Sequence, residues 1–227
     1  MAITIDPRKR VTLRSNPVMF DRVIQDLQQS LANELPWLNH SFGRAERLVK
    51  TQDGRRVYTP NLYIGHKEYV QLLPDQGLGN FSFFVLEEPE QVMGDNHPLL
   101  QMKAPFSLIV WVDMRTVDQR DERNTEDVKA KILATINEFA PLKTGHAHIS
   151  KIYTRAENVF NGFSLDEVSN QYMMAPFCAW RFYGEMQVRD VCREQVQNYL
   201  YVKPEEVIWI DENFDYDIFT NTFWKVV

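Results

Sequence analysis

Cysteine is scarce in this chain, since Cys178 and Cys192 are the only two among 227 residues. This scarcity excludes a small disulfide-stapled secreted domain, and we expect both thiols to be reduced. Glycine and proline number only 9 and 11, and they follow no period, which excludes a collagen-like chain. No apolar run reaches the 18 residues that a membrane-spanning helix needs. We therefore expect no contact with a membrane.

Positive charge is in the minority, because 25 Lys and Arg residues face 31 Asp and Glu residues, for a net charge of −6. A general nucleic-acid-binding protein needs a basic surface that displaces counterions. We therefore expect no sequence-specific nucleic-acid partner. The first residues place a basic cluster after a short apolar start, which is the reverse of a secretory signal. We expect the protein to act in the cytoplasm.

Catalytic motifs are also missing. The sequence has no Gly-x-Ser-x-Gly, no phosphate loop and no dinucleotide fingerprint, and neither cysteine has a histidine beside it. We therefore predict that the protein is not an enzyme and holds no cofactor. One alternative rests on His146 and His148, because residues two apart on a strand share a face and could reach one metal ion. With an acidic partner, that pair could serve a metal-dependent hydrolase.

Periodic apolar residues predict two main helices. The first follows Ser15 or Asn16 as a cap, with Pro17 in its first turn, and ends at Pro36. The second begins after Asn124, which can cap it, and ends at Pro141. A capping-box pattern at residues 164–167 predicts a further short helix that extends to Met173.

Strands are predicted at residues 81–86, 106–114, 148–153 and 177–191, the last with a bulge at Gly184. Asp53-Gly54 predicts a tight hairpin turn. The polar stretch from Glu87 to Pro105 predicts an exposed excursion. Because the strands occur in runs separated by single helices, we predict an α+β fold with a largely antiparallel or mixed sheet. The two main helices should pack on one face of this sheet.

Charge divides the chain into three parts: a basic arm at residues 1–16, one α+β domain at 17–192, and an acidic aromatic extension at 193–227. The arm has four basic residues against one acidic residue, for a net charge of +3. Residues 203–227 have six acidic residues against two lysines, for a net charge of −4. The two ends of the chain are therefore opposite in charge.

The order of these elements resembles a known family. The segments that carry this resemblance are Gly79-Asn80-Phe81-Ser82-Phe83-Phe84, the strand Phe106–Met114 with the helix after it, and the run from Met173 to Gly184 into the last strand. In this order, residues 17–192 resemble the head–tail connector proteins of tailed phages. In particular, they look like tail-terminator, or tail-completion, proteins carried by prophages and mobile elements of Bacteroidetes.

The resemblance implies a structural role in virion assembly in the bacterial cytoplasm, and later in the virion. Tail terminators form rings, so it implies contacts with further copies and with other tail or connector proteins. A ring is built from heterologous contacts. We therefore expect opposite charges to meet between neighbouring subunits, unless both ends are solvated or pair within one chain. The predicted interface residues are Arg8, Lys9, Arg10, Arg14, Asp211, Glu212, Asp215 and Asp217.

Another alternative is a regulatory protein-binding module that uses the excursion at Glu87–Pro105 for recognition.

Overall fold

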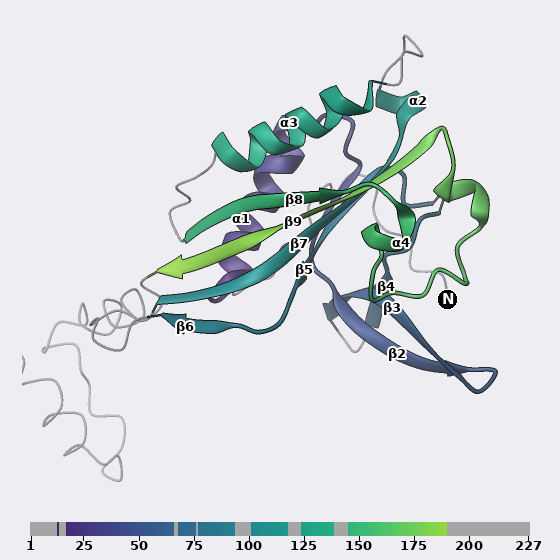
Figure 1. Ribbon diagram of the computed structural model, residues 1–227, viewed down its shortest axis with the longest axis horizontal. Coiled ribbons are helices and arrows are strands. Elements are labelled where there is room, and N and C mark those ends of the chain that lie inside the picture. Colours follow the sequence, from purple (N-terminus) through teal and green to yellow (C-terminus); the bar gives the residue numbers. More distant parts are fainter. Residues whose placement is uncertain are drawn as a thin grey trace, which may run out of the picture. The chain divides into compact units, whose positions relative to one another are not determined.

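The computed structural model describes residue 13 and residues 17–65, 68–75, 77–93, 101–117, 124–138 and 145–189 (Figure 1). The elements are, in chain order, α1 (Phe20–Glu34), β1 (His40–Arg44), β2 (Glu46–Gln52), β3 (Arg55–Gly65), β4 (Glu68–Gln71), β5 (Phe81–Leu86), β6 (Gln91–Met93), β7 (Gln101–Asp113), α2 (Met114–Val117), α3 (Thr125–Glu138), β8 (Gly145–Tyr153), α4 (Ala156–Val159), the 3₁₀ helix η1 (Asn170–Met173) and β9 (Phe177–Arg189).

The main sheet is mixed and has six strands. Five follow the order β1-β5-β7-β9-β8, and β6 pairs with β7 off this path. β1 runs parallel to β5, and the other neighbours are antiparallel. β7 lies at its centre, where β9 pairs with it from Gln101 to Asp113. On the opposite side of β7, β5 and then β6 supply the partners. The predicted α+β class is confirmed.

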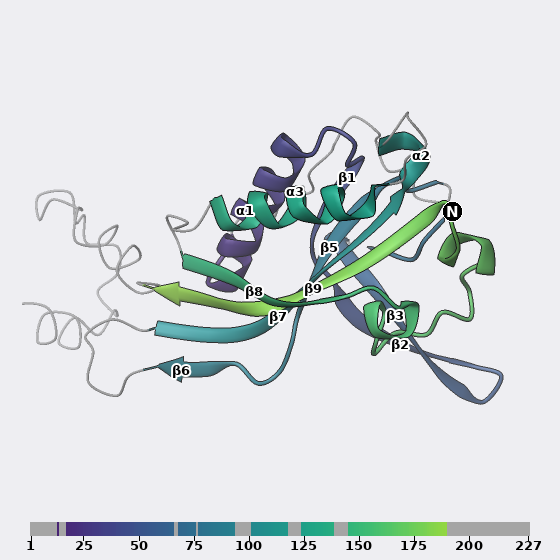
Figure 2. The same ribbon diagram turned by 45° about the horizontal axis from the view of Figure 1, so that its top comes forward.

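α1 and α3 pack on the same face of this sheet, as predicted (Figures 1 and 2). The apolar spacing that predicted these helices is the stripe that they bury, as at Leu27 in α1 and Ile132 in α3. Alternate residues of β7, such as Phe106 and Leu108, close this first core from below. Each such side chain contributes about 1.5–3 kcal/mol by leaving water. No helix in the described ranges is long and apolar enough to cross a membrane.

The observed starts of the two main helices can be compared with the predicted ones. α1 begins at Phe20, later than the predicted start at Pro17, and Ser15 and Asn16 lie outside the described residues. α3 begins as expected, because the Asn124 side chain accepts a hydrogen bond from the backbone N–H of Asp127 at 3.1 Å. This contact satisfies a donor that the first helical turn would otherwise leave open.

The opposite face of the sheet carries a second core. A three-stranded sheet, β2-β3-β4, packs there with the segment around α4 and η1. Trp111 of β7 lies at its centre and stacks on Phe81 and Phe177, with ring centroids 5.7 and 5.0 Å apart. Its indole N–H donates to the Tyr172 carbonyl at 2.9 Å. The two cores together hold α1, α3 and the second sheet on one scaffold.

The predicted hairpin forms between β2 and β3. The two strands pair without interruption from Glu46 opposite Asn61 to Gln52 opposite Arg55. Asp53 and Gly54 both have positive φ angles, 49° and 74°, as a tight turn of this twist requires. The Asp53-Gly54 prediction is therefore confirmed.

Two predictions about strands are wrong. The excursion predicted from Glu87 to Pro105 ends early, because residues 101–105 belong to β7 and Ala104 is fully buried. The bulge predicted at Gly184 lies on the neighbouring strand, between Ile149 and Lys151 of β8. β9 itself pairs regularly with β7 through Gly184.

The predicted capping box at residues 164–167 does not form a helix. The Ser164 hydroxyl accepts a hydrogen bond from the Tyr58 N–H at 3.1 Å, and the Ser164 N–H donates to the Tyr58 carbonyl at 2.7 Å. A distant strand therefore takes the group that would have capped the helix. Only the 3₁₀ helix η1 follows, at the end of the predicted range.

Candidate functional site

The predicted charged interface lies beyond the part of the chain that the structure describes. This holds for every member of the basic arm and the acidic extension: Arg8, Lys9, Arg10, Arg14, Asp211, Glu212, Asp215 and Asp217. The opposite charges at the two ends therefore remain a prediction.

The histidine pair lies on β8, at the edge of the main sheet. His146 is half-buried and His148 is exposed, and their partners on β9 are Gln187 and Glu185. Glu185 is held by Lys103 of β7, with Nζ and Oε2 3.3 Å apart. Within the described ranges, no three His, Cys, Asp or Glu side chains gather as a metal site would require. The structure thus supplies the histidines with a carboxylate neighbour that already has a cationic partner.

A long exposed feature of the described chain is the end of the β2–β3 hairpin, residues 46–56, which we call the hairpin arm. Figures 1 and 2 both show it projecting beyond the main sheet. Every residue from Val49 to Arg56 is exposed, and Val49 keeps 54% of its surface in contact with solvent. Four basic residues and two acidic residues give the arm a net charge of +2. The arm is therefore a basic strand pair with both faces open.

The base of the second sheet adds an aromatic patch. Tyr63 of β3 and Tyr69 of β4 face each other with ring centroids 5.1 Å apart, and Ile64 beside them is also exposed. Partial desolvation raises the pKa of Tyr69, and the Glu46 carboxylate and Tyr63 add to the rise. A side-chain hydrogen bond to Glu46 also raises the pKa of Tyr69, so the phenol is joined to the first residue of the hairpin arm. Amphipathic rings of this kind are common in protein interfaces.

A buried polar cluster, which sequence analysis missed, lies beside the second core. Arg181 of β9 donates from Nε to the Ser107 hydroxyl at 2.7 Å, and it forms an ion pair with Glu87. It also donates to the carbonyl of Asn161 at 3.1 Å. Only 9% of the Arg181 side chain is exposed. Through these contacts Arg181 holds β7, β9 and the segment after α4 together. A buried charge is stable only with such partners.

A second missed cluster surrounds Asn80, at the start of β5. Its amide donates to the Trp37 carbonyl at 2.8 Å and to the Thr116 hydroxyl at 2.6 Å, and its side-chain oxygen accepts from the Asp113 N–H at 2.8 Å. Asn80 is 1% exposed. The residue therefore joins the segment after α1 to the end of β7. No feature of the sequence around Asn80 distinguishes this role from that of an ordinary turn residue.

Comparison with protein-family models gives no match for this chain, and comparison with curated proteins gives none either.

Proposed function

We propose that this protein is an assembly component of a phage-like particle. It resembles a tail terminator and works through contacts with further copies and with other tail or connector proteins. The observation that carries the proposal is the hairpin arm. Its eight outermost residues are exposed on both faces and stand apart from both cores. A two-stranded hairpin is marginally stable by itself, so an arm without core contacts is better explained as a contact surface.

The charge of the arm supports the same function. Lys50, Arg55 and Arg56 lie near its tip, and Asp53 is the acidic residue among them. A basic projection steers association with an acidic surface and fixes its orientation more than it adds affinity. The exposed Tyr63–Tyr69 patch at the base adds apolar area that such an interface can bury.

The segments that carry the family resemblance occupy central places in the fold. Residues 79–84 lead into β5, which pairs with β7, and residues 173–184 lead into β9, which pairs with β7 on its other side. The resemblance therefore rests on the scaffold of the sheet, and the hairpin arm extends from that scaffold.

The test reverses charge on the arm. We expect the full-length double variant Arg55→Glu, Arg56→Glu to associate at least 10-fold more weakly than the wild type in sedimentation experiments at low salt. The wild type should also lose mass as salt rises, because exposed charges are screened. Electron microscopy of the wild type should show closed rings.

The control for this test is Lys131→Glu, Arg155→Glu, which makes the same charge change at exposed positions away from the arm. It should associate like the wild type, and all three proteins should melt at similar temperatures. A wild-type protein that is monomeric at every concentration and salt level would contradict the proposal.

A further inference from the structure

The two edges of the main sheet are unequal. At one edge, four of the five residues of β1 are buried, and α1 packs along it. Gln28 of α1 donates from Nε2 to the Ser41 carbonyl of β1 at 3.0 Å. At the other edge, β8 pairs with β9 and with no other strand of the described chain. Within the described residues, the three-residue strand β6 likewise pairs with β7 alone, so it is a second, much shorter open edge. β8 is therefore the longer edge that can accept another strand.

The borders of β8 suit an added strand on both faces. On the helix side, Ile149, Ile152 and Leu133 are only partly buried, at the margin of the first core. On the opposite side lie His146, His148 and Lys151, of which the last two are exposed. β8 contains no acidic residue. An incoming strand would thus find apolar contacts on one face. On the other it would find His146, His148 and Lys151, and behind His148 the Glu185 carboxylate of β9, which is paired with Lys103.

The bulge limits the length of strand that β8 can accept. Pairing with β9 is regular from Gly145 to Ile149 and shifts before Lys151. Bulges and lysines on an edge strand discourage long sheet extensions. The regular part of β8 spans five residues, so it accepts a short strand and stops there.

The chain itself contains a segment of matching length and charge. Val207-Ile208-Trp209-Ile210 is a run of β-branched and aromatic residues, the types that favour strands. Glu205-Glu206 precede it and Asp211-Glu212 follow it, so acidic residues flank both ends. The 17 residues between Arg189 and Val207 can reach about 55 Å when extended, enough to span to a neighbouring molecule.

We propose that Val207–Ile210 of one copy adds as a strand to Gly145–Ile149 of β8 in a second copy. Main-chain hydrogen bonds would supply affinity, and the acidic flanks beside His148 and Lys151 would supply orientation. The inference rests on the proposed function, because it requires copies of this chain to associate. It gives this association a defined donor strand and a defined acceptor strand.

The experiment disables the donor in the full-length protein. Ile208→Pro removes a backbone N–H and restricts the strand, whereas Thr220→Pro places the same residue elsewhere in the extension. We expect Ile208→Pro to weaken self-association at least 10-fold in sedimentation experiments. Hydrogen exchange of the Gly145–Ile149 amides should become at least 10-fold faster. Thr220→Pro should change neither quantity, and both variants should melt like the wild type.

A labelled peptide of residues 203–212 tests the acceptor directly. It should bind the full-length Ile208→Pro protein and restore protection at Gly145–Ile149, and the same peptide with Ile208→Pro should not. Lys151→Glu in the acceptor should weaken peptide binding about 10-fold at low salt, whereas Lys131→Glu on α3 should leave it unchanged.

The outcomes separate this inference from the proposed function. If the protein is an oligomer whose mass and amide exchange do not change in Ile208→Pro, strand donation is overturned and the proposed assembly function still stands. A protein that is always monomeric overturns both. Amide protection that depends on Ile208 in a monomer would place the strand within one chain and overturn donation between copies. Free exchange at β8 with no peptide binding would overturn strand donation to this edge.

Discussion

At the scale of single residues, close backbone contacts fix which side chains the sheet tolerates. A Cβ atom added to Gly184 would lie 1.9 Å from the His148 carbonyl oxygen, on the neighbouring strand. A Cβ atom at Gly145 would lie 2.3 Å from the Gln187 carbonyl oxygen. In both cases the obstacle is backbone, which cannot move aside as a flexible side chain can. The pairing of β8 with β9 therefore depends on these two glycines.

We predict that Gly184→Ala lowers the free energy of unfolding by about 3 kcal/mol, because β8 must separate from β9 to admit the methyl group. Urea denaturation measures this loss. Gly77→Ala is the matched control, since the nearest atom to its added Cβ would be a side-chain oxygen of Asp75 at 3.5 Å, an ordinary contact. The control should stay within about 0.5 kcal/mol of the wild type. Equal stability of the two variants would contradict the described contact.

At the scale of elements, the junction of β7 and α2 is held by one carboxylate. Arg115 donates to Asp113 through two nitrogens, with Nε 2.9 Å from Oδ1 and the terminal nitrogen 2.7 Å from Oδ2. The Arg115 N–H also donates to Oδ1 at 3.0 Å. These side-chain hydrogen bonds lower the pKa of Asp113 below its ordinary value, against an opposing effect of burial. The Asp113 carboxylate therefore joins the end of β7 to the first turn of α2.

This lowered pKa makes stability depend on pH with a defined sign. Because the pKa of Asp113 is lower in the folded than in the unfolded state, its contribution is complete above the unfolded pKa of about 3.9 and is lost as pH falls through the folded value. We predict that Asp113→Asn destabilises the protein at pH 7 and flattens its loss of stability below about pH 4. Urea denaturation across that range measures the slope. Asp53→Asn, in the exposed hairpin turn, should keep the wild-type slope.

Much of the element pattern could be predicted from sequence, because it depends on local spacing. The apolar period predicted α1 and α3, the β-branched run predicted β7, and Asp53-Gly54 predicted the hairpin. Predictions failed where a distant group intervened. Ser164 bonds to Tyr58, a residue 106 positions earlier, and no local pattern encodes that partner.

The candidate sites follow the same rule. The turn of the hairpin arm was predictable, but its exposure was not, because exposure depends on where the second core ends. Arg181 and Asn80 looked like ordinary polar residues, since their roles arise from partners on other strands and loops. The predicted charged interface, Arg8–Arg14 with Asp211–Asp217, remains a prediction because these residues lie outside the described chain.

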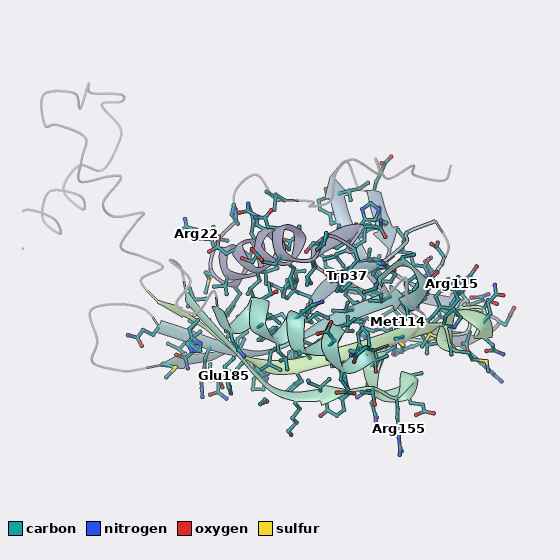
Figure 3. All side chains as sticks on the ribbon, turned by 90° about the horizontal axis from the view of Figure 1, so that it is seen from above. Arg22, Trp37, Met114, Arg115, Arg155 and Glu185 are labelled. Atoms are coloured by element: carbon teal, nitrogen blue, oxygen red, sulfur yellow. The ribbon has the colours of Figure 1, made fainter. Side chains whose placement is uncertain are left out.

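At the scale of the whole molecule, Arg181 joins segments that are far apart in the chain. Its guanidinium contacts Glu87 after β5, Ser107 in β7 and the carbonyl of Asn161 after α4. Arg115 and Glu185 lie toward opposite ends of the sheet (Figure 3). On β9, Arg181 lies between Glu185 and Phe177, and Phe177 pairs with Asp113 at the end of β7. The cluster thus ties the middle of the sheet to the cover of its second core.

We predict that Arg181→Met lowers the free energy of unfolding by about 3–5 kcal/mol, because it leaves the Glu87 carboxylate without its cation. Adding Glu87→Gln to that variant should recover part of the loss, about 1–2 kcal/mol, since the uncompensated charge is then gone. A double-mutant cycle by urea denaturation measures the coupling between the two residues. Strictly additive losses would contradict a direct interaction.

The contact between Gln28 and the Ser41 carbonyl has a consequence for how copies of this protein can meet. Sheets that are open on both sides can concatenate side by side without limit, which is the route to fibrous aggregates. Here α1 packs along β1, so this edge strand cannot take part in such growth. Copies of this protein that meet at high concentration are thereby kept from joining their sheets edge to edge through β1.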